Sequence, residues 1–168
     1  GVSEAVRDES LVPVSLTRPA LDAEFISCYR SHRVEMARIA HLITGSPTAA
    51  EEIVQEAFVR VYERWDDLRT PVAYLRTCVV NRSRSWLRRR RLVKRHEDSV
   101  ERPEAHIDHP NELADALECL TPRAVTVVVL RYYSRLSTAE VAATLKVSEG
   151  TVKSTLARAL TKLKEELG

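Results

Sequence analysis

Apolar residues in the first quarter of the chain recur mostly three or four positions apart, the spacing of one face of a helix. The pattern runs from residue 21 to residue 43, whereas residues 1–20 show no period and contain Pro13 and Pro19. We therefore predict a loose N-terminal arm over 1–20, followed by a helix. The apolar positions of that helix are Leu21, Phe25, Ile26, Tyr29, Met36, Ile39, Ala40 and Ile43.

A second apolar stripe follows the turn-forming sequence TGSPT at 44–48. Thr48 and Glu51 have the spacing of a capping box, so the second helix is expected to begin there. Its buried face is expected to carry Ile53, Val54, Ala57, Phe58, Val61, Tyr62 and Trp65. Its opposite, polar face carries Glu52, Gln55, Glu56, Arg60 and Glu63.

A third helix is predicted from about residue 72 to residue 95, after a loop at 66–71. Leu75 and Val79 are expected in the core, whereas the pattern leaves Trp86 open between core and surface. Residues 96–110 contain two prolines and no apolar period, so we interpret them as a linker.

The apolar spacing after the linker predicts another short helix, through Leu113, Ala116, Leu117 and Leu120, which ends at Thr121-Pro122. The next segment, 123–136, is apolar and rich in β-branched residues, so propensity alone would also allow a strand there. We predict a helix, because a lone strand among helices would have no partner.

The last 32 residues carry the strongest local signal, two capped helices joined by a three-residue turn. Ser137 and Ser148 are the predicted caps, and this arrangement is typical of a helix-turn-helix whose second helix enters the DNA major groove. An ordinary helical hairpin with a cationic face is the alternative. Val152, Leu156, Ala159 and Leu163 are expected to face inward. The outward positions are Gly150, Thr151, Lys153, Ser154, Thr155 and Arg158.

Charge along the 168 residues is segregated, although the formal net charge is only +2. Residues 76–95 hold nine basic residues and no acid, 96–119 hold eight acids and one base, and 120–168 hold eight bases and four acids. Such blocks predict two polyanion-binding units separated by an acidic linker. The expected fold is all-α, with two small helical domains, the C-terminal one a helix-turn-helix.

The basic strip RSRSWLRRRRLVKR at 82–95 contains Trp86, with Tyr74 and Asn81 upstream. Arginines bind phosphates and aromatic rings stack on unpaired bases, so the strip suits single-stranded or melting DNA. A solvated helix end is the alternative for the strip, and a place in the core is the alternative for Trp86. No catalytic constellation and no cofactor motif is present, and the histidines of the linker are a poor metal cage, so we expect no enzyme, cofactor or metal.

Composition excludes other classes of protein. The three cysteines lie far apart, no apolar run approaches the length of a membrane span, and residues 1–20 lack the order of a signal peptide. We therefore expect a cytoplasmic, nucleoid-associated protein that does not bind membranes and is a monomer when free.

Two long segments resemble the extracytoplasmic-function sigma factors of the sigma-70 family, which serve bacterial RNA polymerase. ITGSPTAAEEIVQEAFVRVYERWDDL with PVAYLRTCVVNRSRSWLRRRR is similar to their first conserved domain, region 2. LTPRAVTVVVLRYYSRLSTAEVAATLKVSEGTVKSTLARALTKL is similar to their second, region 4. The resemblance implies a region 2 domain over 21–95 and a region 4 domain over 111–168, with promoter selection and DNA melting as the function.

The resemblance also implies roles for particular residues. The acidic helix face, Glu52, Gln55 and Glu56, would bind the coiled coil of the largest polymerase subunit, and 123–136 would engage the flap of the second-largest subunit. Binding and melting of the minus-10 element would fall to Asp66, Asp67, Leu68, Arg69, Tyr74, Asn81, Arg82, Arg84, Trp86, Arg88 and Arg89. Binding of the minus-35 duplex would fall to Ser148, Glu149, Gly150, Thr151, Lys153, Ser154, Thr155 and Arg158.

An anti-sigma protein is a further partner that the resemblance implies. Two positions depart from the family pattern: Thr155 stands where arginine is common, and Lys146 stands where the turn usually has glycine. The rival interpretation is a free-standing helix-turn-helix regulator that binds duplex DNA without polymerase.

Overall fold

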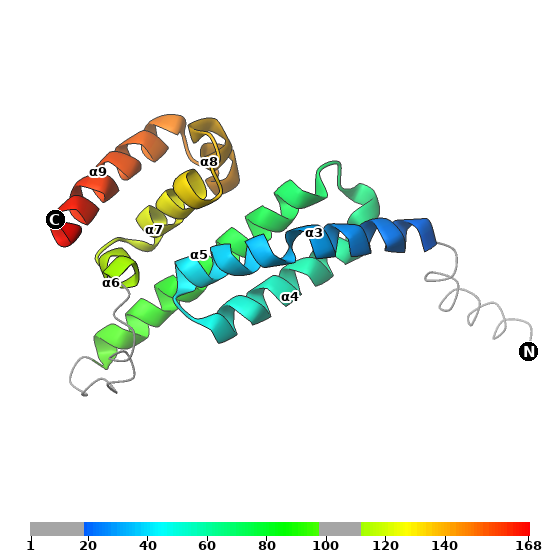
Figure 1. The fold of residues 1–168 in the computed structure, drawn as a ribbon, viewed down its shortest axis with the longest axis horizontal. Helices are drawn as coiled ribbons and strands as arrows, with labels where there is room; N and C mark the ends of the chain where they lie inside the picture. Colours follow the sequence, from blue (N-terminus) through cyan, green and yellow to red (C-terminus); the bar gives the residue numbers. More distant parts are fainter. Residues whose placement is uncertain (1–18, 98–111) are drawn as a thin grey trace, which may run out of the picture.

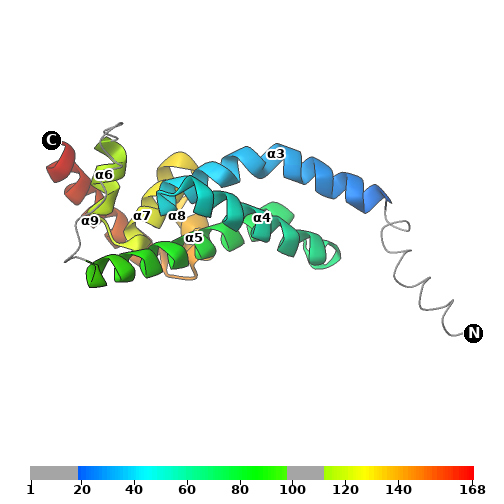
Figure 2. The same cartoon turned by 90° about the horizontal axis from the view of Figure 1, so that it is seen from below.

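The computed structural model describes residues 19–97 and 112–168, and no strand occurs within these two ranges. The first range forms a bundle of three long helices, α3 (Pro19–Thr44), α4 (Pro47–Glu63) and α5 (Pro71–His96), with a 3-10 turn η1 at Trp65–Asp67. Each of the three packs on the other two, and the bundle is elongated (Figures 1 and 2). Neither range contains a helix with the length and hydropathy that a membrane crossing requires.

The start of α4 differs from the sequence prediction. Ser46, not Thr48, is the N-cap, and its side chain accepts a hydrogen bond from the Ala49 amide at 3.1 Å. The predicted capping box of Thr48 and Glu51 is therefore wrong. The reason is Pro47, which takes the first helical position because its fixed φ suits that site and its missing N–H is no loss there.

The core of the bundle contains the apolar stripe predicted for α4. Its side chains from Ile53 to Val61 pack against Met36 and Ile39 of α3 and Leu75 and Val79 of α5. Tyr62 is exposed instead of buried, and its hydroxyl donates to Asp22 at 2.9 Å.

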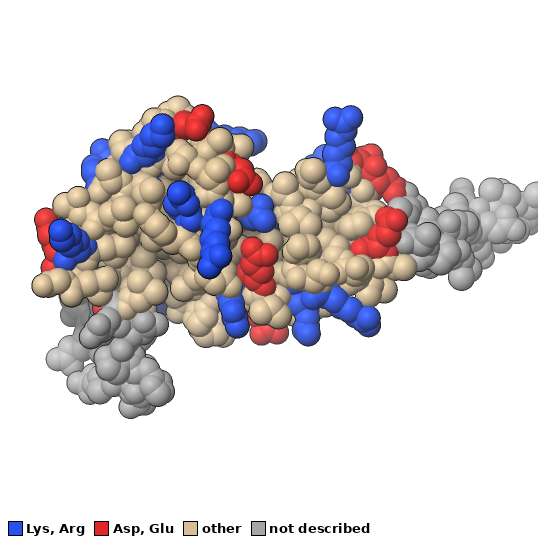
Figure 3. Space-filling model, turned by 45° about the horizontal axis from the view of Figure 1, so that its top comes forward, with Lys and Arg blue, Asp and Glu red and all other residues tan. Residues whose placement is uncertain are grey.

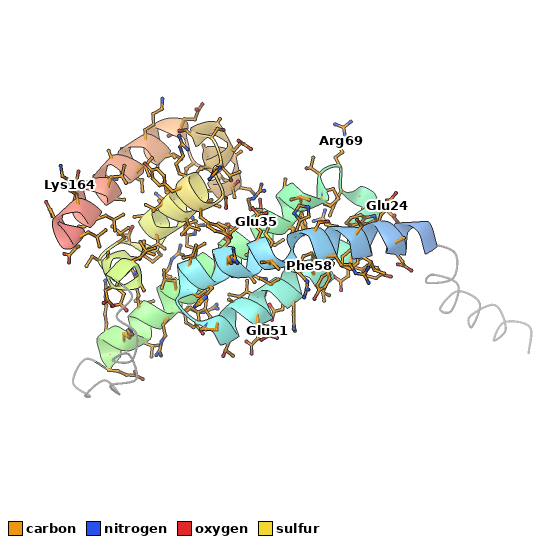
Figure 4. All side chains as sticks on the ribbon, in the orientation of Figure 1. Glu24, Glu35, Glu51, Phe58, Arg69 and Lys164 are labelled. Carbon is orange, nitrogen blue, oxygen red and sulfur yellow. The ribbon has the colours of Figure 1, made fainter. Side chains whose placement is uncertain are left out.

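Aromatic rings join α3 to α4. The Phe25 ring meets the rings of Phe58, Tyr62 and Trp65 edge to face, with centroids 4.9–6.3 Å apart. In Figure 4 Phe58 lies between the two helices. The hydrophobic face of α4 is thus fixed against α3 and α5, and its polar face is left outward.

The second described range folds into α6 (Glu112–Glu118), α7 (Pro122–Val128), α8 (Thr138–Leu145) and α9 (Glu149–Leu167). The helix predicted over 123–136 is confirmed against the alternative strand, although its second half is a π-helical turn, η2 (Val129–Tyr133), in which the Ser134 amide donates to the Val129 carbonyl at 3.1 Å. All but the first two residues of the predicted linker lie outside the described residues.

The helix-turn-helix is confirmed in α8 and α9. Ser137 and Glu140 form a reciprocal capping box, and hydrogen bonds from Ser137 lower the pKa of Glu140, so this cap persists at neutral pH and is lost as the carboxylate is protonated in acid. Lys146 occupies the left-handed region at φ 56°, ψ 46°, which costs a non-glycine residue about 1–2 kcal/mol. Ser148 then caps α9 through the Thr151 amide at 3.1 Å.

The two domains pack against each other, a question that the sequence leaves open. α5 contacts α7 and α8, and α3 contacts η2 and α7. One buried cluster extends from Met36 of the bundle to Leu163 of α9. Both views show the C-terminal helices resting on the bundle (Figures 1 and 2), so the molecule is closed along a seam between α5 and α7–α8.

Candidate nucleic-acid interface

A groove of about 480 Å³ lies between α4 and α5, and it joins two sets of side chains for which the resemblance implies different partners. Glu52 and Glu56 come from the polar face of α4, while Asn81, Arg82 and Trp86 come from α5. The remaining lining residues are Ala49, Ile53, Arg60, Ser85 and Arg89. Gln55 is exposed on the same face of α4 but does not line the groove.

An ion pair crosses this groove, because Nη1 of Arg82 donates to Oε2 of Glu56. Both side chains are partly exposed, so the pair contributes little to folding stability. Its importance is electrostatic: each group has a partner inside the chain, whereas Glu52 and Arg89 have none that the structure records among the described residues.

The predicted loop after α4 is partly a 3-10 turn, which contains Asp66 and Asp67, and only 68–70 lie outside a helix, with Leu68 extended. Leu68 packs on the core, and Arg69 projects away from the bundle (Figure 4). Arg64 stacks over the Tyr74 ring at 5.2 Å and donates to its hydroxyl at 3.3 Å. The loop and the start of α5 therefore present a polar rim around a half-buried tyrosine.

The basic strip of α5 faces three directions. Arg88, Arg89 and Arg90 are exposed, as expected for groups that bind phosphate. Trp86 is half-buried, since one part of it packs on the core and another lines the groove. The two interpretations that the sequence allows for Trp86, a core residue and a surface residue, are thus each correct in part.

Arg84 is partly buried, and the nearby charge of Arg123 comes from the C-terminal domain. Burial, followed by the charges of Arg88 and Arg123, lowers the pKa of its guanidinium. Arg123 belongs to α7, so two like charges meet across the seam. Figure 3 shows several basic side chains close together near the middle of one face.

In the helix-turn-helix, Ser148, Glu149, Gly150, Lys153, Ser154 and Arg158 are exposed along α9. Thr151 is half-buried, and its hydroxyl lies 2.9 Å from that of Ser148. Thr155 is only 6% exposed, so the expectation that it faces outward is wrong. It lies on the inner face of α9 with Val152 and Ala159, where its side chain is too buried to contact DNA.

Sequence reasoning missed three polar residues at these surfaces: Arg60 and Ser85 in the groove, and Arg64 over Tyr74. A signal for the first two exists, because Arg60 follows Glu56 by one helical turn and Ser85 follows Asn81 by the same step. Arg64 reaches Tyr74 because the chain turns back through η1, and the spacing of apolar residues does not predict this turn.

Comparison with known proteins places both domains. The family model for sigma-70 region 2 matches residues 28–93, and that for sigma-70 region 4 matches residues 116–165. An RNA polymerase sigma-E factor of Streptomyces avermitilis is 40% identical over 154 residues, which cover 86% of this chain and 85% of the relative. The sigma factor SigL of Mycobacterium tuberculosis, named as an extracytoplasmic-function factor, is 32% identical over 157 residues, 83% of this chain and 88% of SigL.

Solved structures agree on the fold. RpoE of Bartonella quintana, in complex with the anti-sigma factor NepR, has a TM-score of 0.69 at 22% identity and covers 86% of this chain and 96% of its own. CnrH, in complex with the cytosolic domain of CnrY, has a TM-score of 0.67 at 25% identity and covers 87% and 88%. The free-standing regulator is therefore not favoured. The chain belongs to the extracytoplasmic-function sigma factors of the sigma-70 family, which direct RNA polymerase to promoters.

Proposed function

We propose that the two domains divide promoter recognition, with the α3–α5 bundle binding polymerase and the melted minus-10 element and α9 binding the minus-35 duplex. The observation that carries this proposal is the groove between α4 and α5. Its acids come from one helix, and its cations and indole ring come from the other. A cationic helix tip on a separate domain supplies the second contact.

The polymerase contact is assigned to Glu52, Gln55 and Glu56, which would meet a basic surface on the coiled coil of the largest subunit. Glu52 is the sharpest probe, because Glu56 is already paired with Arg82. The apolar segment 123–136 is assigned to the flap of the second-largest subunit, and its exposed Tyr132 and Tyr133 would supply rings for that contact.

Glu52→Arg is expected to weaken binding to core polymerase by about ten-fold or more, because it places like charges opposite each other. The measurement is fluorescence titration of labelled chain with core enzyme, followed by run-off transcription. Glu51→Arg is the matched control, since Glu51 is exposed in the same turn of α4 but does not line the groove. Equal losses of affinity for core polymerase in the two variants would show that the groove is not part of the polymerase contact.

Strand opening is assigned to the loop residues Asp66, Asp67, Leu68 and Arg69 and to the α5 residues Tyr74, Asn81, Arg82, Arg84, Trp86, Arg88 and Arg89. Unstacking a base costs a few kcal/mol, and each base–aromatic contact returns about 1–3 kcal/mol. A few such contacts with arginine–phosphate pairs can therefore trap an open stretch of duplex without ATP.

Trp86→Ala and Asn81→Ala are expected to reduce permanganate reactivity of the minus-10 element about ten-fold in the holoenzyme, because a base loses its stacking or hydrogen-bonding partner. Gel shift on the intact minus-35 duplex should change much less. Asn81 is the cleaner probe, since it lines the groove without being part of the buried core. Parallel losses of opening and duplex binding would refute this division of labour.

Sequestration by an anti-sigma protein is the regulation we propose. RpoE and CnrH, two of the structures similar in fold, are each described with a partner, NepR or the cytosolic domain of CnrY. The groove and the exposed Arg88 and Arg89 are accessible in the structure, so a partner that covers them would keep the chain inactive. We expect one to cover the α4–α5 groove.

A further inference from the structure

The part of the chain that the structure describes contains three residues with a positive φ, Gly45, Arg135 and Lys146. Gly45 lies between α3 and α4, where a glycine adopts φ 73° without strain. A Cβ at Gly45 would meet no atom within 4 Å, so the backbone conformation, and not a lack of space, favours glycine there. Arg135 and Lys146 adopt φ 57° and 56° with long side chains, although this conformation is unfavourable for any residue with a Cβ.

The two strained residues occupy equivalent places at the two ends of α8. Each lies just past the end of a helical segment and two positions before the serine that caps the next helix, and the residue between them is apolar and packs inward. The amide of that apolar residue donates to a carbonyl of the preceding helical segment at 3.0 Å in both cases. The two segments are Arg135-Leu136-Ser137 and Lys146-Val147-Ser148.

Folding does not explain why these positions carry a charge. Both side chains are exposed, and neither forms an ion pair or a hydrogen bond with another side chain within 19–97 or 112–168. Glycine would allow the same turn without strain, because it adopts positive φ freely. Strained backbone of this kind persists at sites that serve binding, so the two cations point to a ligand outside the chain.

The place of the two cations in the helix-turn-helix indicates what that ligand is. When such a motif docks on DNA, its first helix crosses the phosphate backbone and the start of its second helix enters the major groove. Arg135 and Lys146 directly precede the caps of these two helices. Glu140 and Glu149 lie in the first turns of the same helices, where their carboxylates would repel phosphate. Each cation therefore offsets an acid near the start of a helix that approaches DNA.

We propose that Arg135 and Lys146 are phosphate contacts that fix the helix-turn-helix on the minus-35 duplex, one at each end of α8. α8 has 8 residues and is about 12 Å long at about 1.5 Å per residue, close to the width of about 12 Å of the major groove. The two cations therefore bind two different phosphates. Such contacts orient α9 and carry no sequence information, which leaves base recognition to α9 itself. The proposal rests on the proposed function, because it takes α9 as the helix that binds this duplex.

Arg135→Gly and Lys146→Gly are each expected to weaken binding of the holoenzyme to all minus-35 duplexes by a similar, several-fold factor. Each should also reduce the steepness of log affinity against log salt concentration by about 0.9, the value for one phosphate contact. Fluorescence anisotropy with labelled duplex over a series of potassium chloride concentrations measures both quantities. Unchanged affinity and an unchanged salt dependence in the two variants would overturn the proposal.

Duplexes with one neutral methylphosphonate at a time would locate the contacts. The unsubstituted holoenzyme is expected to lose affinity at several positions, and each glycine variant should become insensitive at one of them. The position should differ between Arg135→Gly and Lys146→Gly, because the two cations lie at opposite ends of α8. Insensitivity at the same position in both variants, or at none, would contradict two separate phosphate contacts.

The stability of the free chain separates a binding role from a structural one. Both glycine variants are expected to raise the midpoint of urea unfolding by a few tenths of a molar, because glycine relieves the strain at positive φ. Weaker DNA binding by a more stable protein is not expected of residues that only support the fold. A lowered midpoint would show that the side chains stabilise the fold, and would overturn the proposal.

Three variants serve as controls. Arg135→Lys and Lys146→Arg keep the charge and should bind duplex as the unsubstituted chain does. Lys164→Gln removes a charge in the last turn of α9, far from both turns (Figure 4), and should also leave affinity unchanged. A loss in Lys164→Gln equal to that in the glycine variants would mean that net charge matters and position does not, which contradicts the proposal.

Arg158→Ala, measured alongside, tests the proposed function separately. If this variant changes the ranking of duplex sequences while the glycine variants bind normally, the phosphate contacts are refuted and minus-35 recognition by α9 stands. If the unsubstituted holoenzyme itself shows no preference for a minus-35 duplex, the proposed function is refuted.

Discussion

Arg158→Ala is expected to lower the preference of the holoenzyme for its own minus-35 element by about 1–3 kcal/mol, roughly 5- to 150-fold. Arg158 is exposed on α9 and lies beyond the capped N-terminus of that helix on its outward face. A guanidinium in this place can donate two hydrogen bonds to a guanine edge in the major groove. Competition gel shifts with promoter duplexes substituted one base pair at a time would locate the lost contact.

Lys162→Ala is the control for charge. Lys162 is exposed one helical turn after Arg158 and is expected to bind phosphate if it reaches DNA at all. Its loss should weaken all duplexes by a similar factor and leave the ranking of sequences intact. An unchanged ranking with Arg158→Ala would instead transfer base recognition to another residue of α9, such as Lys153 or Ser154.

Leu75→Ala is expected to reduce the free energy of unfolding by about 2–5 kcal/mol. Leu75 is 0% exposed in the first turns of α5 and packs in the cluster shared by α3 and α4. Its truncation removes apolar contacts and leaves a cavity that rigid, interlocked helices fill only in part. Urea denaturation followed by circular dichroism measures the loss.

Leu92→Ala makes the same chemical change on the same helix at a position that is 50% exposed. We expect its free energy of unfolding to stay within about 0.5 kcal/mol of the unsubstituted chain. A comparable loss in both variants would mean that α5 is stabilised by its helix propensity and not by the packing of its buried face.

The helices and the helix-turn-helix could be predicted because their signals are local. Three- and four-residue steps of apolar residues, prolines and serine caps mark α3, α4, α5, α8 and α9. Thr155 was misplaced for a different reason. It follows Val152 by three residues and precedes Ala159 by four, so its angle on the helix pointed inward, while its polarity suggested the surface. For Thr155, the position around the helix axis predicts burial correctly, whereas the polarity of the side chain does not.

Other misses reflect competition between neighbouring signals. Thr48 and Glu51 fit a capping box, but Ser46 and Pro47 form a better cap two residues earlier. The π-helical turn η2 has no simple sequence mark; Leu130 within it and Leu136 after it are both buried.

The seam is the part that no sequence pattern indicates. Arg88, Arg89, Arg90 and Arg91 are identical in type and adjacent in the chain, yet only the last reaches α6. Which arginine turns inward depends on the rotation of α5 and on where α7 and α8 rest, and both are set by contacts between residues far apart in sequence. The sequence pattern does not indicate the groove either, because Glu56 and Arg82 come together only when the chain folds.

The uninterrupted course of α5 has a mechanical consequence. Its 26 residues form one rod about 39 Å long at about 1.5 Å per residue, with Tyr74 near one end and Arg91 near the other. No proline or glycine interrupts it after Pro71, so it has no joint at which a tilt could be absorbed. A displacement of α5 near Arg91 is therefore transmitted along a stiff helix to Tyr74, and a displacement near Tyr74 is transmitted to Arg91.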